Sequence, residues 1–224
     1  MPDSDLAPPV EPKPAASPAA SPAASPAPSP VASPAPSPVA SPVASPVPPA
    51  PGALEFVRAF VNTRDVEAGT DRLADPASWA GWAGEHGIRG ATDAEALARA
   101  IDLRESLRQA LLANHDRLPL PASTATALTD AARRSRAAVT FTPEGVVLAG
   151  RAGDQGMDAV IGRVLGATAA ALADGTWARL KVCANDRCRW AFYDHSRSRT
   201  GRWCSMQLCG NRVKQARWRT GQAT

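Results

Sequence analysis

The sequence has few aromatic residues, few histidines and no long apolar run, and each shortage excludes a class of protein. It contains 6 Trp, 4 Phe, 1 Tyr and 3 His among 224 residues. No nucleophile elbow, phosphate-cradling glycine loop or carboxylate pair occurs, so we expect no enzyme. No apolar run approaches the roughly 18 residues of a membrane span, and the acidic start lacks a signal-peptide pattern. We therefore expect a cytoplasmic protein with no membrane partner.

Residues 1–52 lack aromatic residues altogether and contain 18 of the 22 prolines. Ser-Pro recurs there every four residues from Ser17 to Ser45. Such a segment cannot bury enough apolar surface to offset the entropy of ordering it, and its prolines favour an extended chain. We predict a disordered, semi-rigid spacer over 1–52. A ligand for proline-binding domains, or a phosphorylated or glycosylated tract, is the alternative.

The positive charge lies almost entirely at one end of the chain. The net charge of the whole sequence is +4, but residues 181–224 carry ten Lys and Arg against Asp186 and Asp194. All four cysteines are in the same segment. A basic C-terminal segment on a near-neutral body indicates a polyanion partner.

Residues 53–178 have the apolar periodicity of a mostly helical domain with one small β-hairpin. Asp75-Pro76 is a helix start, and Thr92-Asp93-Ala94-Glu95 has the pattern of a capping box. A β-hairpin is expected over 139–148, followed by a helix that Gly175 ends. The first helix is expected to run from about residue 53 to Arg64.

Few side chains of this body are candidates for a function. Asn62, Thr63 and Arg64 form a polar cluster at the end of the first helix and could bind a small effector, although helix capping explains them nearly as well. Trp79 and Trp82, three residues apart, are expected in the core rather than in a ligand cage. His86 and His115 lie near helix ends, where capping explains them better than catalysis.

The cysteines occur as two close pairs, Cys183-x4-Cys188 and Cys204-x4-Cys209, separated by fifteen residues. Two pairs at this separation are typical of a four-thiolate zinc site, because Zn²⁺ prefers four tetrahedral ligands and thiolates suit it. We therefore predict one bound Zn²⁺, with an intervening hairpin that brings the pairs together. Two disulfides or four free buried thiols are the alternatives, and His195 is expected in a surface loop rather than as a ligand.

A short basic helix is expected directly after Cys209. At 100° per residue, Val213 and Ala216 share an apolar side and the polar and cationic side chains cover the rest. Cations could contact phosphates, amides could reach base edges, and Trp203 or Trp218 could stack on unpaired bases. The candidate nucleic-acid-binding residues, from the preceding loop and this helix, are Arg197, Arg199, Arg202, Asn211, Arg212, Lys214, Gln215, Trp218 and Arg219.

The motifs Cys183-x4-Cys188, Trp190-Ala191-Phe192-Tyr193 and Cys209-Gly210-Asn211-Arg212 resemble the CGNR zinc finger. Upstream, Phe60-Val61-Asn62-Thr63, Asp75-Pro76 and Trp82 resemble the ABATE domain that usually precedes that finger. The resemblance covers residues 54–220. It implies a bacterial, stress-related transcription regulator with a zinc-ribbon-like module that binds nucleic acid.

We predict an α+β protein in three parts: a spacer over 1–52, a helical ABATE-like domain over 53–178 and a CGNR-type zinc finger over 179–224. The expected function is a zinc-binding transcription regulator whose C-terminal module contacts DNA or RNA. A zinc-stabilised adaptor that docks an acidic protein surface is the alternative. A small-molecule effector in the helical domain and a homodimer are further partners left open.

Overall fold

The computed structural model describes residues 47–142, 145–149 and 154–221, which belong to one compact unit. The Ser-Pro repeats of the predicted spacer lie outside the described residues. The last residues of that predicted spacer, however, are part of the fold. Ala50 is buried in the core, and its backbone N–H donates a 2.7 Å hydrogen bond to Glu55.

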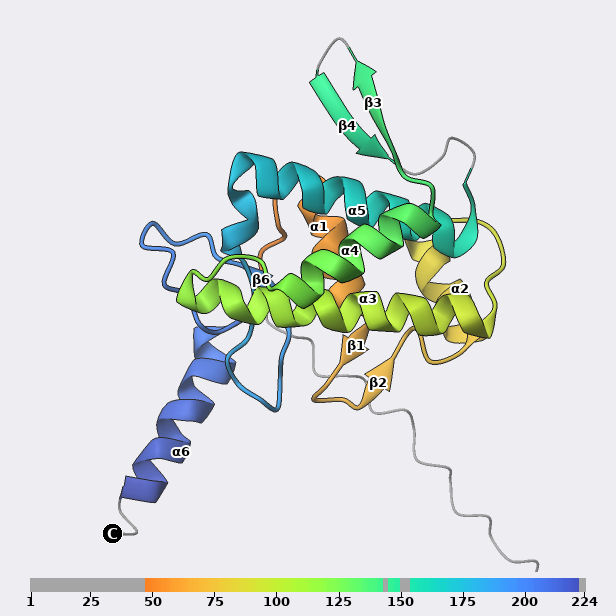
Figure 1. Ribbon diagram of the computed structural model, residues 1–224. Helices are drawn as coiled ribbons and strands as arrows, with labels where there is room; N and C mark the ends of the chain where they lie inside the picture. The colour runs from red at the N-terminus through yellow and green to blue at the C-terminus, as the bar shows by residue number, and fades with distance from the viewer. Residues whose placement is uncertain (1–46, 143–144, 150–153, 222–224) are drawn as a thin grey trace, which may run out of the picture. The chain divides into compact units, whose positions relative to one another are not determined.

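Helices account for most of the described chain (Figure 1). In chain order they are α1 (Leu54–Val61), α2 (Pro76–Glu85), α3 (Ala94–Ala113), α4 (Ala122–Arg134), α5 (Gly156–Asp174) and α6 (Asn211–Gly221). Short 3₁₀ turns cover Asn114–Asp116 and Thr176–Arg179, and a π-helical turn covers Met206–Gly210.

Local capping chemistry determines where several helices begin and end. Asp75 caps α2 by accepting hydrogen bonds from the N–H groups of Ala77 and Ser78, as predicted. Gly175, with a φ of 77°, ends α5, also as predicted. The predicted capping box at the start of α3 is wrong in detail, because Asp93 is the capping residue and the Thr92 hydroxyl has no hydrogen-bond partner among the described residues.

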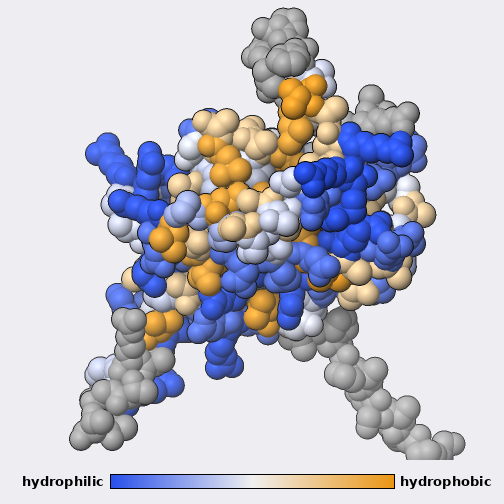
Figure 2. Space-filling model, viewed as in Figure 1, coloured by the Kyte–Doolittle hydropathy of each residue, from blue (hydrophilic) through white to orange (hydrophobic). Residues whose placement is uncertain are grey.

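Within the described residues, six strands form three two-stranded antiparallel sheets. They are β1 (Arg64–Asp65) with β2 (Thr70–Asp71), β3 (Ala138–Thr142) with β4 (Gly145–Ala149), and β5 (Leu180–Val182) with β6 (Ala191–Tyr193). The β3–β4 hairpin confirms the sequence prediction and projects away from the helices (Figure 1). Hydrophobic surface extends to its base on the face shown in Figure 2. The β1–β2 hairpin was not predicted, and the first helix ends at Val61 rather than at Arg64.

One hydrophobic core joins the helical domain to the last sheet. Phe60, Trp79 and Leu107 are buried in it, so the predicted core role of the tryptophans is confirmed. Leu180 and Val182 of β5 and Tyr193 of β6 belong to the same core. A second, smaller cluster consists of the buried cysteines with Trp190 and Trp203 against them. The sheet β5–β6 therefore connects the core to the cysteine cluster.

Helix α5 is the one described helix that is long and apolar enough to cross a membrane by length and composition. Its 18-residue window has a mean hydropathy of 1.3, and 56% of that window is buried inside the fold. Val160, Val164 and Leu165 are among its core residues. These properties are those of a core helix in a globular protein, and nothing else among the described residues points to a membrane.

Candidate metal centre and nucleic-acid interface

The four cysteine thiols converge on one point. The Sγ atoms of Cys183, Cys188, Cys204 and Cys209 all lie within 4.8 Å of one another. Sγ of Cys204 is 3.6 Å from Sγ of Cys188 and 3.7 Å from Sγ of Cys209. All four cysteines are free, and a disulfide would need a separation of about 2.05 Å. The disulfide alternative therefore does not describe this structure.

These separations suit a tetrahedral metal with thiolate ligands. A Zn–S bond of about 2.3 Å places the sulfurs of a regular tetrahedron about 3.8 Å apart. Hydrogen bonds that the Cys204 thiol donates to Cys183 and Cys188, together with burial and neighbouring negative charge, raise the pKa of Cys204. Burial and the charge of Cys183 raise the pKa of Cys209. Four thiolates at these distances repel one another, so a divalent cation is what allows all four to ionise together.

The first cysteine pair lies in a tight loop at the end of β5. The N–H of Cys188 donates to the carbonyl of Asn185 at 2.9 Å, and the N–H of Cys183 donates to the carbonyl of Trp190 at 2.8 Å. Arg189 takes up the left-handed conformation with a φ of 53°, which turns the chain back into β6. Strand β6 then pairs with β5. The predicted hairpin between the two cysteine pairs is therefore wrong, because β6 pairs with the strand before the first pair.

The second cysteine pair lies at the start of the basic helix. Ser205 caps the π-helical turn by accepting a hydrogen bond from the N–H of Leu208. Cys209 lies within that turn, and α6 continues from Asn211. A Cβ atom on Gly210 would approach Sδ of Met206 to 2.5 Å, so the Met206 side chain would have to move if a larger residue replaced this glycine. The amide of Asn211 donates to the carbonyl of Gln207 at 3.0 Å and is exposed.

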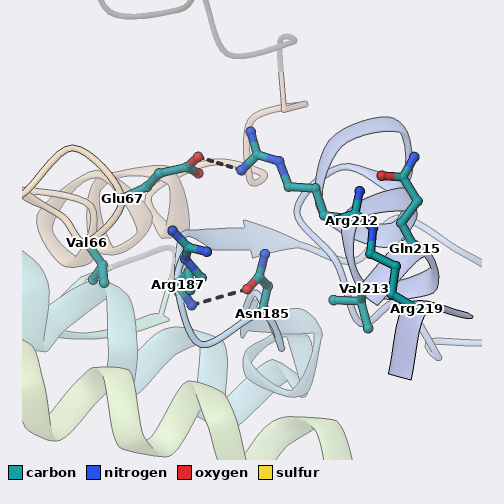
Figure 3. A pocket seen from close by; sticks show the side chains of 8 residues that line it. All are labelled: Val66, Glu67, Asn185, Arg187, Arg212, Val213, Gln215 and Arg219. Carbon is teal, nitrogen blue, oxygen red and sulfur yellow. Dashed lines mark hydrogen bonds and ion pairs between the residues drawn. The ribbon is translucent and has the colours of Figure 1, made fainter. Parts of the chain in front are cut away.

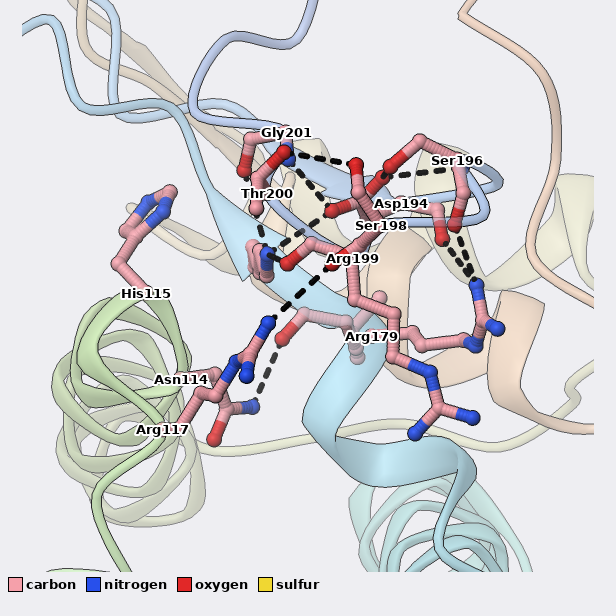
Figure 4. Close-up of polar contacts among 12 residues, drawn as sticks. Asn114, His115, Arg117, Arg179, Asp194, Ser196, Ser198, Arg199, Thr200 and Gly201 are labelled. Atoms are coloured by element: carbon pink, nitrogen blue, oxygen red, sulfur yellow. Dashed lines mark hydrogen bonds and ion pairs between the residues drawn. The ribbon is translucent and has the colours of Figure 1, made fainter.

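A buried ion pair that sequence reasoning missed holds the loop between the two cysteine pairs. Lys181 Nζ lies 2.9 Å from Asp194 Oδ2, and both side chains are almost fully buried. Lys181 also donates to the carbonyls of Arg199 and Gly201 at 2.7 and 3.3 Å. Asp194 accepts further hydrogen bonds from Ser196 and from the N–H of Gly201. The two residues together close the loop 194–201, and Figure 4 shows the contacts of Asp194 in it.

Arg179, just before β5, and Arg117, in the helical domain, hold the same loop from outside. Arg179 donates to the carbonyls of Asp194 and Ser196, both at 3.0 Å, and Arg117 donates to the carbonyl of Ser198 at 3.2 Å. Burial opposes ionisation of Asp194, yet hydrogen bonds from Ser196 and Lys181 lower its pKa to about 2. The loop is therefore held by charged groups on both sides (Figure 4).

The nine residues predicted to contact nucleic acid are all exposed. Arg197, Arg199 and Arg202 lie on or beside the loop held by Asp194, and the other six lie on α6. Val213 is half-buried, as predicted for the apolar side, while the side chain of Ala216 lies outside the described residues. Of these nine residues, Arg212 forms an ion pair with Glu67, at a distance of 2.5 Å. Trp218 is 64% exposed and free to stack on a partner, whereas Trp203 packs against the cysteines.

The residues of the polar cluster predicted as an effector site contact other parts of the fold. The amide of Asn62 pairs with the backbone of Ala191 in both directions, at 2.7 and 3.0 Å. Thr63 is buried and accepts a 3.1 Å hydrogen bond from Arg104, while Arg64 is exposed in β1. The contacts of Asn62 attach β6 to the helical domain, so the hydrogen-bonding capacity of this cluster serves the fold.

Histidines take no part in the cysteine cluster. His195 is exposed in the loop, and its Nε2 lies 3.1 Å from the carbonyl of Pro49. His86 and His115 contact backbone carbonyls of Trp82 and Val182, at 2.9 and 2.5 Å. The contact of His86 agrees with the predicted capping role, because Trp82 lies in the last turns of α2. The capping role predicted for His115 is wrong, because Val182 belongs to β5 rather than to a helix end. Buried Arg108 also attaches the cysteine loop by donating to the carbonyl of Arg189 at 3.1 Å.

The fold and the cluster define a class: a helical domain followed by a small four-cysteine metal-binding finger with a basic helix. Comparison with family models agrees. Residues 53–175 match ABATE, described as "putative stress-induced transcription regulator", and residues 179–221 match the CGNR zinc finger. The chain therefore belongs to the ABATE family and carries a C-terminal CGNR zinc finger. Neither family is one of enzymes. A comparison with curated proteins finds no match.

Proposed function

We propose that the four cysteines bind one Zn²⁺ and that the surface built around this ion binds nucleic acid. The observation that carries the proposal is the convergence of four Sγ atoms within 4.8 Å at the root of α6. Zinc supplies a rigid tetrahedral link between the two cysteine loops. The chain's own residues then do the binding: α6 and the loop 194–201 present their cations from a fixed base.

The electrostatic arrangement supports a polyanion as the partner. Arg197, Arg202 and Lys214 are exposed and have no carboxylate partner among the described residues. Cations of this kind bind phosphates and release counterions, which makes the affinity depend steeply on salt. The exposed amides of Asn211 and Gln215 are able to bond base edges, and Trp218 offers a stacking surface.

The test compares two variants that lose the same charge. The first, Arg197→Ala/Arg202→Ala/Lys214→Ala, removes three cations from the proposed surface. Its control, Arg89→Ala/Arg133→Ala/Arg134→Ala, removes three exposed arginines from the helical domain.

Affinity for random-sequence DNA and RNA is measured by fluorescence anisotropy at several salt concentrations, with zinc content checked in every protein. The first variant should lose about two to three units of salt slope on duplex DNA, since each phosphate contact contributes about 0.9. The control should keep the wild-type slope. Equal slopes in both variants would contradict the proposal.

Two substitutions address sequence readout. Asn211→Ala and Gln215→Ala leave the charge unchanged, so neither should change the salt dependence of the affinity. Each should reduce the difference in affinity between the preferred sequence and random sequences. The preferred sequence comes from selection with the zinc-loaded protein on random DNA and RNA pools. An unchanged difference in both variants would assign sequence preference to other residues.

One observation favours the adaptor as a second candidate function. Met206 and Leu208, on the turn that carries Cys209, are 51% and 39% exposed. Apolar side chains next to a basic surface suit an acidic protein with an apolar patch. Retention of a protein partner at high salt, together with loss of binding in Met206→Ser/Leu208→Ser, would support the adaptor. Salt-sensitive nucleic-acid binding that survives this substitution would support the regulator.

A further inference from the structure

A cavity lined mostly by charged and amide residues lies between the β1–β2 turn and the zinc finger (Figure 3). It has a volume of about 630 Å³, within the range of small-molecule sites. Three segments far apart in sequence line it: the β1–β2 turn, the first cysteine loop and α6. The lining residues are Val66, Glu67, Asn185, Arg187, Arg212, Val213, Gln215 and Arg219.

Cationic groups outnumber anionic ones in this cavity. Arg187, Arg212 and Arg219 line it, and Glu67 is the carboxylate among the lining residues. Glu67 pairs with Arg212 at 2.5 Å. The neighbouring carboxylate of Asp186 pairs with Arg189 instead. Within the described part of the chain, Arg187 and Arg219 therefore face the cavity without a carboxylate partner.

The remaining lining atoms are suited to an anion rather than an apolar ligand. Oδ1 of Asn185 accepts a 3.2 Å hydrogen bond from the N–H of Arg187, so its Nδ2 is left as a donor (Figure 3). Gln215 adds a second amide. Val66 and Val213 are the apolar lining residues, too few for a hydrophobic site. Guanidinium forks together with amide donors match the geometry of phosphate oxygens.

We propose that this cavity binds a phosphate monoester, which Arg187 and Arg219 hold while Arg212 exchanges its contact with Glu67 for a contact with the phosphate. The phosphate belongs either to a free mononucleotide or to the 5′ end of a nucleic-acid strand. The proposal goes beyond the nucleic-acid surface above, because Asn185 and Arg187 lie outside that surface. Arg212, Gln215 and Arg219 are common to both.

The direct test is calorimetric titration of the zinc-loaded full chain with AMP, and with adenosine as the matched ligand without phosphate. We expect one saturable AMP site per chain and at least tenfold weaker binding of adenosine. Arg187→Ala should weaken AMP binding by about tenfold or more, since a hydrogen-bonded charge pair is lost. Arg89→Ala, an exposed arginine of the helical domain, should change the affinity less than twofold.

Glu67→Gln gives a second, independent result. It removes the carboxylate that competes for Arg212, so AMP should bind several-fold more tightly. Absence of saturable AMP binding would overturn the proposal, as would equal binding of adenosine. Equal losses in Arg187→Ala and Arg89→Ala, or weaker binding in Glu67→Gln, would also overturn it, because AMP would then bind through general charge.

The source of the phosphate is resolved with oligonucleotides. A 5′-phosphorylated strand that binds at least tenfold more tightly than its 5′-hydroxyl counterpart, with the difference lost in Arg187→Ala, identifies the strand end. Equal binding of both strands together with tight AMP binding identifies the free nucleotide. The Arg197→Ala/Arg202→Ala/Lys214→Ala variant should bind AMP normally. The failure of one proposal is therefore distinguishable from the failure of the other.

Discussion

Replacing Lys181 with Met should destabilise the protein far more than the loss of a surface cation. Lys181 and Asp194 form a buried pair whose side chains are 2% and 3% exposed. Removal of one partner leaves an uncompensated buried charge, which costs about 3–5 kcal/mol. Asp194 keeps its hydrogen bonds from Ser196 and Gly201. We therefore expect a loss at the low end, about 3 kcal/mol.

The assay is urea unfolding of the zinc-loaded protein at pH 7, followed by tryptophan fluorescence. Asp194 is ionised there, because hydrogen bonds lower its pKa to about 2, below its ordinary value of 3.8. Because the pKa of Asp194 is lower in the folded than in the unfolded protein, its ionised form stabilises the fold. This contribution to the free energy of unfolding is present in full above about pH 4 and is lost as the pH falls through about 2. The measurement at pH 7 therefore reports the charged pair.

The control is Arg133→Met, which removes one partner of an exposed pair 3.7 Å from Asp130. We expect it to cost no more than about 0.5 kcal/mol. Lys181→Met/Asp194→Asn should recover part of the loss, since neither charge is then left alone. A cost for Lys181→Met as small as that of Arg133→Met would refute the assignment of this pair as the anchor of the loop.

The pair also links stability to binding. Lys181 holds the carbonyls of Arg199 and Gly201, so its loss should release the loop that presents Arg197. In the absence of urea, where the variant is still folded and zinc-loaded, its affinity for nucleic acid should then be lower than that of the wild type. Unchanged affinity in folded Lys181→Met would show that the loop makes no contact with the ligand.

Three further outcomes are expected. Chelation should expose the two cysteine loops and α6 to hydrogen exchange while α3 and α5 stay protected, because β5 remains in the main core; loss of protection throughout would contradict this. Burial raises the pKa of Asp71, but hydrogen bonds from Arg104 overcome it and hold the pKa below 3.8. The free energy of unfolding of wild type should exceed that of Asp71→Asn, with both proteins measured in the presence of a chelator. This difference should be complete above about pH 4 and should shrink as the pH falls through the lowered pKa of Asp71. A difference of equal size at every pH would refute that. Deletion of residues 1–46 should leave the melting temperature unchanged, whereas deletion of 1–52 should lower it by removing buried Ala50; equal melting temperatures would be inconsistent with a core role for Ala50.

The sequence alone was sufficient to predict features that depend on residues close together along the chain. The spacing of Cys183 and Cys188, and of Cys204 and Cys209, predicted a four-thiol cluster, and the structure brings the sulfurs together. Asp75 and Gly175 marked helix ends correctly, because capping depends on backbone groups within a few residues. The same reasoning assigned the cap of α3 to Thr92 rather than to Asp93, one residue away.

Contacts between distant parts of the chain were decided by tertiary packing. Asn62 looked like a member of an open polar cluster, but its amide pairs with Ala191, 129 residues away. Lys181 looked like one more cation of a basic tail, but burial against Asp194 turned it into the anchor of a loop. Arg187 became a cavity residue only because the β1–β2 turn lies opposite it. Residue spacing in the sequence predicts contacts between groups that are near one another along the chain. The partners of Asn62, Lys181 and Arg187 are distant along the chain, and they meet because a shared core brings their segments together.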